Sequence, residues 1–198
     1  MLFAGEDSEY LADGYLELIP GYLPAQRADA LLSALLNDCH WEQPSLTLYG
    51  KSHPIPRLQS WLGSDAIDYR YSGQTFTSSV WPNYVEQLSD ELSLRCGIRF
   101  NSVLANLYRN GEDSMGWHAD DEPELGNDPI IASISLGAER DFAIRRTGVS
   151  RQAGNLALPH GSLLIMQAGM QSHWQHSVPK RKRVSEPRIN LTFRQISR

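Results

Sequence analysis

The stretch Arg188-Ile189-Asn190-Leu191-Thr192-Phe193-Arg194, close to the end of the chain, has the alternation of a β-strand. Side chains two apart on a strand point to the same face, so Arg188, Asn190, Thr192 and Arg194 share one side. The planar fork of an arginine pairs with a carboxylate through two hydrogen bonds. This strand therefore predicts a carboxylate-binding site within a β structure.

Short β-rich runs fill the second half of the chain and lead up to this strand. They cover residues 103–108, 130–136, 141–146, 155–158, 162–166, 174–178 and 189–193. Turn residues such as Asn110-Gly111, Gly126-Asn127 and Gly161 separate them. Many short strands at this spacing predict a sandwich or a barrel, and a double-sheet jelly roll (a double-stranded β-helix) fits best. Such a barrel encloses a pocket at its mouth, where residues from different strands converge.

The first hundred residues contain two helical patterns. Residues 24–37 carry leucine and alanine at helical spacing, and residues 80–94 show a second apolar stripe. Between them, residues 46–57 predict a hairpin or an exposed loop, because alternation is followed by Gly and Pro. We therefore expect a mainly β (α+β) fold forming one domain over residues 1–198, with the N-terminal helices packed outside a jelly-roll core at 101–198.

Composition narrows the class of protein. A hydrophobic content of 41% suits a globular core and excludes a disordered chain. The acidic start and the lack of a long apolar run predict neither a signal peptide nor a membrane span. Cys39 and Cys96 lie far apart without metal-binding spacing and predict two buried thiols in a reducing compartment. We expect a cytoplasmic protein, or a nuclear one in a eukaryote, with no membrane partner.

The net charge of −5 conceals a basic C-terminal third. Residues 140–198 hold eleven Lys or Arg against two acidic residues, and Lys180-Arg181-Lys182-Arg183 is the densest run. A local basic patch can bind phosphates even on an acidic protein. A solvated face that balances acidic surface elsewhere is the alternative, and the sequence leaves both open.

Residues with metal-ligand chemistry precede the arginine strand. His118 and Asp120 form a His-x-Asp, and His173 and His176 supply a distant histidine. Two histidines and one carboxylate form the facial triad that binds Fe(II) and leaves positions open. On a strand His118 and Asp120 would share a face, whereas His173 and His176 would face opposite sides. We favour His176 as the ligand, because it is closer to the arginine strand, and expect His173 to pack nearby.

Asn106 and Tyr108 lie two apart on an apolar run, so both point to one face of a strand. A polar amide and a phenol in a core need hydrogen-bond partners. Other core residues or a bound dicarboxylate could supply them, and the residues alone leave both open. Iron with open positions beside a carboxylate-binding strand predicts 2-oxoglutarate-dependent oxygen chemistry.

Together these segments resemble the AlkB-type Fe(II)/2-oxoglutarate dioxygenases, which repair alkylated nucleic-acid bases. The resemblance runs from about residue 45 to the end, and residues 188–194 match the Arg-x-Asn-Leu-Thr-Phe-Arg signature at every fixed position. It implies Fe(II) held by His118, Asp120 and His176, with O2 and 2-oxoglutarate as co-substrates.

The resemblance also assigns the co-substrate site. It implies that Asn106, Tyr108 and Arg188 bind the distal carboxylate of 2-oxoglutarate and that Arg194 binds the end next to the metal. Asn190 and Thr192 line the same strand face and would support the site.

Substrate contacts follow from the same resemblance. Trp61, Tyr69 and Tyr71 resemble the family's nucleotide-recognition lid, where aromatic rings stack on bases, with packing against the barrel as the alternative. Residues 48–50 (Leu48, Tyr49 and Gly50) resemble the intercalating hairpin finger of the branch that prefers duplex DNA, with a plain exposed hairpin as the alternative. Asp121 and Glu122 match an acidic pair beside the substrate base, which favours a cationic lesion.

The expected function is oxidative demethylation of 1-methyladenine- or 3-methylcytosine-type lesions in duplex DNA, by a monomer that releases succinate, CO2 and formaldehyde. The same chemistry on single-stranded DNA, on RNA or on a protein side chain is the first alternative. A non-catalytic nucleic-acid-binding module with a structural metal is the second. Structural metal sites usually have closed coordination by Cys or His, and three ligands with open positions do not match that pattern.

Overall fold

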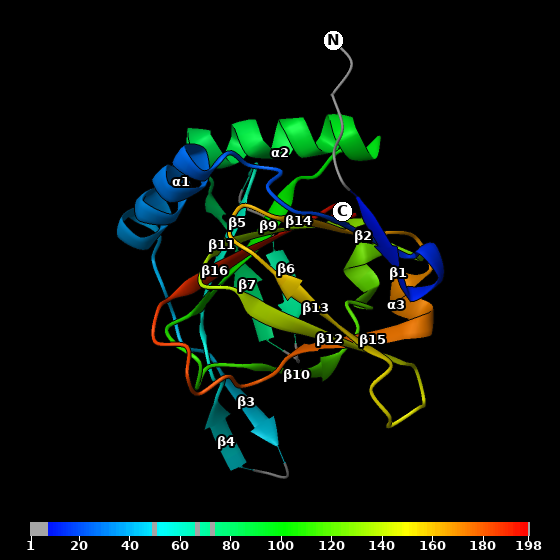
Figure 1. Cartoon of the computed structure of the whole chain (residues 1–198). Helices are drawn as coiled ribbons and strands as arrows, with labels where there is room; N and C mark the ends of the chain where they lie inside the picture. The colour runs from blue at the N-terminus through cyan, green and yellow to red at the C-terminus, as the bar shows by residue number, and fades with distance from the viewer. Residues whose placement is uncertain (1–7, 49–50, 66–67, 72–73, 198) are drawn as a thin grey trace.

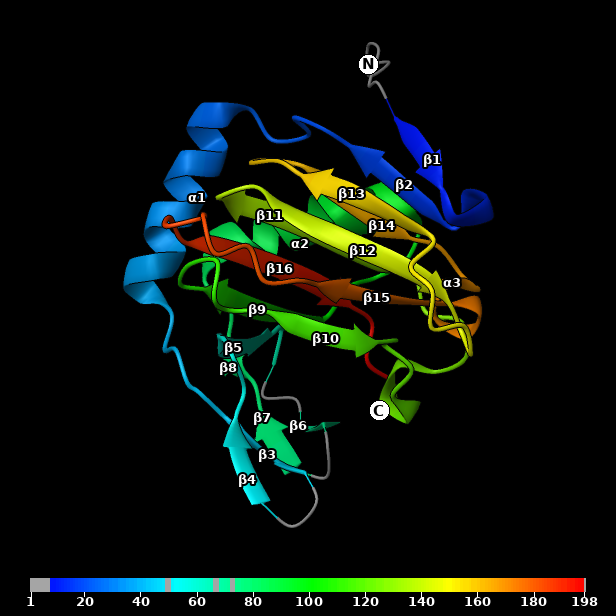
Figure 2. The same cartoon turned by 60° about the horizontal axis from the view of Figure 1, so that its bottom comes forward.

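Two β-sheets face each other at the centre of the molecule (Figures 1 and 2). The structure, a computed structural model, describes residues 8–48, 51–65, 68–71 and 74–197. The large sheet has the strand order β1 (Glu9–Leu11), β2 (Leu16–Ile19), β14 (Leu163–Met166), β11 (Ile131–Gly137), β16 (Arg188–Arg194), β9 (Ser102–Tyr108), β5 (Leu58–Gly63) and β8 (Ser79–Val80). The small sheet has the order β10 (Met115–His118), β15 (Trp174–Val178), β12 (Arg140–Arg146) and β13 (Gly154–Leu158). The jelly-roll expectation is thus confirmed.

Two helices, α1 (Ala25–Asp38) and α2 (Asn83–Cys96), cover the outer face of the large sheet (Figure 1). Leu31 and Leu35 of α1 and Leu88 and Leu92 of α2 are buried with the sheet residues in one apolar cluster. Three short helical segments are also present: η1 (Ala12–Gly14), η2 (Pro123–Leu125) and α3 (Met170–His173). The prediction of a helix at 24–37 agrees with α1 within one residue at each end.

The second helix begins later than predicted. Val80 lies in β8 and is 69% exposed, and α2 starts at Asn83 directly after Pro82. Proline disfavours a helical backbone at the residue before it and is well tolerated at a helix start, so the apolar stripe could not extend back to Val80.

The alternation along β16 and β9 divides the molecule into two environments. Ile189, Leu191 and Phe193 point toward α1 and α2 and are fully buried in the apolar cluster there. The intervening polar residues therefore point into the space between the two sheets. A second apolar cluster, which includes Phe142, Ile144 and Trp174 of the small sheet, closes part of that space. The remaining part is polar and forms the site described below.

The first hundred residues hold more than helices and a lid. Strands β1, β2, β5 and β8 join the large sheet, so the division into an outer N-terminal part and a C-terminal core was incomplete. The antiparallel pairing of β5 with β9 aligns Gln59 with Asn106 and Leu58 with Leu107. This pairing brings residues just before and within β5 to the edge of the polar space.

Two separate hairpins stand apart from the core. The first, β3 (Ser45–Leu48) with β4 (Lys51–Pro54), projects beyond both sheets in the two views (Figures 1 and 2). It confirms a hairpin in the 46–57 region, whereas Tyr49 and Gly50, which stand between its two strands in the sequence, lie outside the described residues. The second hairpin, β6 (Asp68–Tyr71) with β7 (Gln74–Thr77), carries Tyr69 and Tyr71 on one strand.

Cys39 and Cys96 are free and half-buried, and burial raises the pKa of each thiol to about 11. Among the described residues, no helix has both the length and the apolar character needed to cross a membrane.

We expect Gly111→Ala to destabilise the fold by about 1–3 kcal/mol, the usual cost of forcing atoms into a packed site. Gly111 donates its N–H to the Val184 carbonyl and accepts a hydrogen bond from the Arg181 N–H. A Cβ at Gly111 would lie 1.7 Å from the Arg181 carbonyl oxygen, so the 181–184 loop would have to move. Urea unfolding measures the change. Gly116→Ala, which meets open space, is the control; equal stability of the two variants would contradict the packing argument.

Candidate metal and co-substrate site

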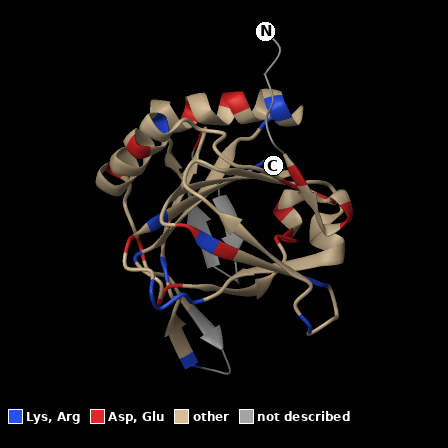
Figure 3. Cartoon of the chain, in the orientation of Figure 1, with Lys and Arg blue, Asp and Glu red and all other residues tan. Residues whose placement is uncertain are grey.

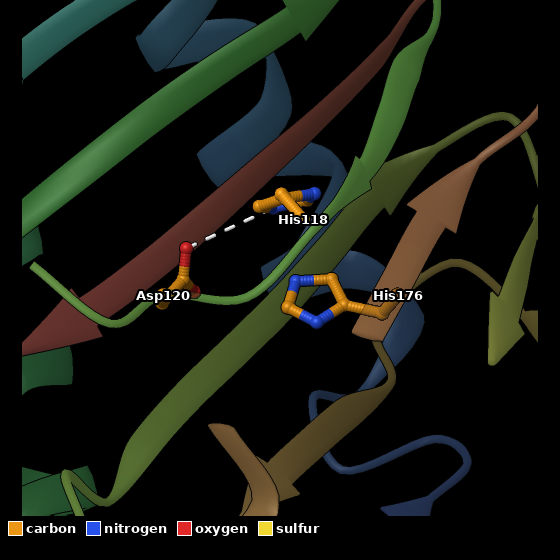
Figure 4. A group of neighbouring side chains, drawn as sticks. All are labelled: His118, Asp120 and His176. Atoms are coloured by element: carbon orange, nitrogen blue, oxygen red, sulfur yellow. Dashed lines mark ion pairs between the residues drawn. The ribbon is translucent and has the colours of Figure 1, made fainter. Parts of the chain in front are cut away.

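Three buried or half-buried side chains with metal-binding atoms meet between the sheets. They are His118 at the end of β10, Asp120 in the following loop and His176 on β15 (Figure 4). One ligand atom from each lies within 4.8 Å of the others. The pairing of β10 with β15 places His118 opposite His176, and their ring centroids are 4.1 Å apart. His118 Nε2 is 3.7 Å from Asp120 Oδ1.

The route by which Asp120 reaches this cluster differs from the prediction. Strand β10 ends at His118, and its register with β15 shifts between Met115 and His118. Asp120 therefore lies outside the strand ladder, and the argument that residues two apart share a strand face does not apply to it. The loop nevertheless turns its carboxylate toward both histidines, as Figure 4 shows.

The protonation states suit a divalent metal. His118 Nδ1 lies 2.9 Å from the Gly116 carbonyl, which fixes the proton there and leaves Nε2 with a free electron pair. Burial lowers the pKa of both imidazoles, and with the neighbouring His118 it brings the pKa of His176 to about 3. Both rings are therefore neutral at neutral pH, the form that binds metals.

The carboxylate of Asp120 is ionised. Burial alone would raise its pKa, but the charge of Arg194 together with the two histidines outweighs burial and lowers the pKa to about 2. Arg194 Nη2 lies 2.9 Å from Asp120 Oδ1. On the other side of the cluster, the Phe142 ring stacks on His176 at 4.9 Å and holds the imidazole plane. Two neutral imidazoles and one carboxylate form the donor set that suits Fe(II).

His173 takes no part in the cluster. It ends α3, and its exposed ring lies 5.6 Å from the Tyr15 ring. The preference for His176 over His173 therefore agrees with the geometry.

Arg188 and Arg194 lie at opposite ends of β16, on the face turned toward the small sheet. Arg194 reaches Asp120 at the metal end. Arg188 Nη2 donates to Ser135 Oγ at 2.9 Å, and its guanidinium lies 5.3 Å from the centroid of the Tyr108 ring. Between them, Asn190 donates to Ser133 Oγ at 2.7 Å, and Thr192 is buried on the same face.

Arg188 is the strongest indication of an anion site. The residue is 1% exposed, and its Nε and Nη1 atoms have no hydrogen-bond partner among the described residues. Burial lowers the pKa of this guanidinium to about 10, against the opposing effect of Tyr108, so the side chain remains a cation at neutral pH. A buried cation with free donors is costly unless an anion pairs with it. A carboxylate group fits these donors.

Asn106 belongs to a network that sequence reasoning missed. Its Oδ1 accepts hydrogen bonds from Arg57 Nε at 2.8 Å and from Gln59 Nε2 at 3.1 Å. Arg57 is 3% exposed, so a third buried arginine stands beside the site. Of the two partners left open for Asn106, the structure shows the core network. Arg57 follows Pro56 and carries no periodic signal, and only the β5–β9 pairing places it there.

The polar space around the cluster is a cavity of about 40 Å³, lined by residues that include Asn106, Tyr108, Met115 and Met166 beside the three ligands and Arg194. That volume holds an ion and a few waters. A cleft of about 690 Å³ lies elsewhere, lined by α2 and β2 residues such as Glu17 and Arg95. We place the chemistry in the smaller cavity, because among the described residues only it contains a group of three metal ligands.

The predicted substrate residues occupy different places. Asp121 is exposed one position after the Asp120 ligand, and Glu122 is half-buried where η2 begins. Trp61 is on β5 of the large sheet, not on the β6–β7 hairpin, and packs with Leu125 and Ile196. Its ring centroid is 6.0 Å from the Arg194 guanidinium, so Trp61 borders the metal end of the site.

Comparisons with known proteins agree with this geometry. The family model of the 2OG-Fe(II) oxygenase superfamily matches residues 15–194. The human alpha-ketoglutarate-dependent dioxygenase alkB homolog 3 is 40% identical over 188 residues, which are 90% of this chain and 65% of that protein. The human DNA oxidative demethylase ALKBH2 is 43% identical over 156 residues, which are 75% of this chain and 60% of that protein.

The fold has a solved counterpart. The structure of OsALKBH1 superposes with a TM-score of 0.67 at 18% sequence identity and covers 95% of this chain and 99% of that one. The chain spans about 65% of the length of the alkB homolog 3 proteins that it matches. The family uses Fe(II), 2-oxoglutarate and O2, which the site's donor set and its buried arginine fit. The chain belongs to the 2OG-Fe(II) oxygenase superfamily, and within it resembles the AlkB homologues.

Proposed function

We propose that this protein is an Fe(II)- and 2-oxoglutarate-dependent dioxygenase that removes alkyl groups oxidatively from nucleobases of the 1-methyladenine and 3-methylcytosine type in DNA, acting as a monomer. The observation that carries the proposal is the buried His118–Asp120–His176 cluster on the small-sheet side, together with the incompletely paired Arg188 on the facing polar side of β16. The similarity to a human DNA oxidative demethylase supports the class of substrate.

In this proposal His118, Asp120 and His176 hold Fe(II). The bound iron would supply the activation of O2, coupled to conversion of 2-oxoglutarate to succinate and CO2. Arg188 and Tyr108 would bind the distal carboxylate of 2-oxoglutarate, with Asn106 fixed beside them by Arg57.

The metal end of the co-substrate would meet Arg194. In the structure Arg194 pairs with Asp120 and lines the cavity, so its guanidinium is within reach of an anion that enters beside the metal ligands. Asn190 and Thr192, which lie between the two arginines along β16, line the cavity. Oxidation of an N-methyl group gives a hydroxymethyl group that leaves as formaldehyde.

The charges and the two hairpins support a nucleic-acid substrate. Asp121 is exposed one position after the ligand Asp120, and its carboxylate would attract a cationic methylated base. The β6–β7 hairpin carries Tyr69 and Tyr71, for which we propose base stacking, and the projecting β3–β4 hairpin would carry Tyr49 as a wedge in duplex DNA. The target base must leave the stack to reach a metal enclosed between two sheets.

Succinate and formaldehyde formation tests the proposal directly. The protein is supplied with Fe(II), ascorbate and 2-oxoglutarate, with and without an oligonucleotide containing 1-methyladenine. Formaldehyde and extra succinate with the methylated strand are the expected result. Succinate without stimulation by the methylated strand would retain the dioxygenase and reject this substrate. A methylated RNA of the same sequence identifies an RNA preference.

The basic run at 180–183 yields a second prediction. Lys180 lies 3.5 Å from Glu112, and Arg181 pairs with Asp141, whereas in the described part of the chain neither Lys182 nor Arg183 forms an ion pair. Figure 3 shows Lys and Arg, interspersed with Asp and Glu, on loops at the side from which β3–β4 projects. We therefore expect these two residues to contact DNA phosphates.

Replacing both Lys182 and Arg183 with Ser should lower DNA affinity and make its salt dependence shallower by about one unit of slope for each lost contact. Fluorescence anisotropy over a salt series measures both quantities. Arg151→Ser, which removes an exposed arginine from the β12–β13 loop, is the matched control. A slope unchanged in the double variant would show that this run is a solvated face only.

A further inference from the structure

We propose that Gln171 is a positioning residue that fixes the backbone of Asp120 and so sets the geometry of the metal cluster. This inference rests on the proposed metal site and concerns a residue 51 positions away from Asp120 along the chain. Its side-chain Oε1 accepts a hydrogen bond from the Asp120 N–H at 2.9 Å.

The Asp120 N–H needs a partner because of where the strand ends. β10 stops at His118, so Asp120 has left the ladder that pairs β10 with β15. Asp120 is also 4% exposed, which keeps water from its backbone. A buried N–H without an acceptor destabilises the folded protein. The Gln171 carbonyl takes the place of the missing strand partner.

The side chain of Gln171 is itself held in place, so its carbonyl oxygen stays directed at the Asp120 N–H. It is 5% exposed, it lies in α3, and its Nε2 donates to Met166 Sδ at 3.4 Å. Met166 itself lines the cavity that contains the metal ligands. Both ends of the amide are therefore engaged, which fixes the orientation in which the carbonyl oxygen faces Asp120.

The location of α3 gives this bond a second consequence. α3 leads directly into β15, which carries His176, and Gln171 precedes His176 by five residues. A single side chain thus ties the loop of one metal ligand to the segment that delivers another. Arg194 holds the Asp120 carboxylate from the other side at 2.9 Å. With its backbone and its carboxylate both held, Asp120 is kept within reach of His118 and His176.

The test is the affinity of the apoprotein for Mn²⁺, measured from the electron paramagnetic resonance of the free ion, with thermal unfolding of the apoprotein recorded beside it. Gln171→Met keeps the length and volume of the side chain and removes the acceptor. Loss of a partner that orients a metal ligand typically costs about 10–100-fold in affinity, and we expect a loss in that range. Gln171→Glu retains an acceptor oxygen and should restore much of the affinity.

Two further variants complete the design. Ser172→Ala changes the next residue of α3, whose exposed hydroxyl donates to Asp128, and should bind Mn²⁺ like the unmodified protein. Gln171→Asn keeps the amide but is too short to reach, and it substitutes for Gln171→Met if that variant does not fold. A lower unfolding temperature with unchanged Mn²⁺ affinity would overturn the proposal, because it would show a structural role only. Equal losses in the Met and Glu variants would overturn it as well.

These measurements separate the inference from the proposed function. Mn²⁺ binding needs neither 2-oxoglutarate nor nucleic acid, so a sensitive Gln171 with no activity on methylated DNA would support the positioning role and reject the substrate. Formaldehyde release from methylated DNA, together with a Mn²⁺ affinity that Gln171→Met leaves unchanged, would support the substrate and reject the positioning role.

Discussion

Replacing Asp120 with alanine abolishes succinate formation and lowers metal affinity by at least about 100-fold: this is the largest effect we expect from any single substitution. Removing a residue that merely orients a metal ligand lowers metal affinity by about 10–100-fold. Removing the ligand itself should therefore lower metal affinity by at least about 100-fold. Asp120 is the single anionic ligand of the cluster, with a pKa lowered to about 2, and therefore supplies its negative charge at any physiological pH.

The measurement pairs succinate formation with Mn²⁺ affinity in the same preparation. Asp120→Asn is the matched variant, because it preserves the shape and one oxygen and removes the charge. We expect it to lose most of the affinity too, since a neutral amide no longer offsets the charge of the metal or of Arg194. Thermal unfolding confirms that each variant is folded. An Asp120→Ala protein that retains normal Mn²⁺ affinity would remove Asp120 from the metal site.

The sequence predicted the polar face of β16 because a strand has a period of two, and that period requires no knowledge of the partners. Arg188 and Arg194 therefore lie on one face of β16, as predicted, and this face is turned toward the small sheet. The buried apolar residues of the same strand face the helices. The same rule failed at Asp120, which lies past the end of β10, because strand ends depend on pairing partners that local pattern does not reveal.

Site residues that are positioned by the pairing of distant strands could not be predicted from the sequence. Arg57 and Gln59 meet Asn106 because β5 pairs with β9, and the partners lie almost fifty positions apart along the chain. Gln171 is further removed from the metal motif and belongs to a four-residue helix without a periodic signal. Single polar residues that support the site reach it only through the pairing of strands that are distant in sequence. The metal ligands themselves could be predicted, because their residue types and spacing match known ligand chemistry.

The second large effect concerns Arg188 and has opposite signs in two measurements. We expect Arg188→Met to lower the affinity for 2-oxoglutarate by roughly 100- to 4,000-fold, because removing one partner of a buried charge pair costs about 3–5 kcal/mol and 1.4 kcal/mol is tenfold. The same change should stabilise the apoprotein by about 1–3 kcal/mol, since an apolar side chain replaces a buried cation whose Nε and Nη1 lack partners among the described residues. The lost bond to Ser135 is included in that range.

Urea unfolding with and without 2-oxoglutarate measures both the stability of the apoprotein and the stabilisation by the co-substrate. The co-substrate should stabilise the unmodified protein and leave Arg188→Met unchanged, because only a ligand that binds the native state shifts unfolding. The matched control is Arg140, the other buried arginine near Tyr108, which lies 5.5 Å from the same ring. Arg140 donates to the carbonyls of Asn110, Asp113 and Pro179 at 3.2, 2.8 and 2.8 Å.

Arg140→Met should therefore destabilise the apoprotein, by about 1–3 kcal/mol for each carbonyl that stays buried without a donor. Replacing either of the two arginines near Tyr108 should thus change stability in opposite directions. Both terminal nitrogens of Arg140 donate to carbonyls and only its Nε lacks a partner, whereas both Nε and Nη1 of Arg188 lack one among the described residues. Destabilisation of the apoprotein by Arg188→Met, to the same extent as by Arg140→Met, would show that Arg188 is a structural residue. The buried charge would then serve the fold, and the assignment of the co-substrate carboxylate to Arg188 would be wrong.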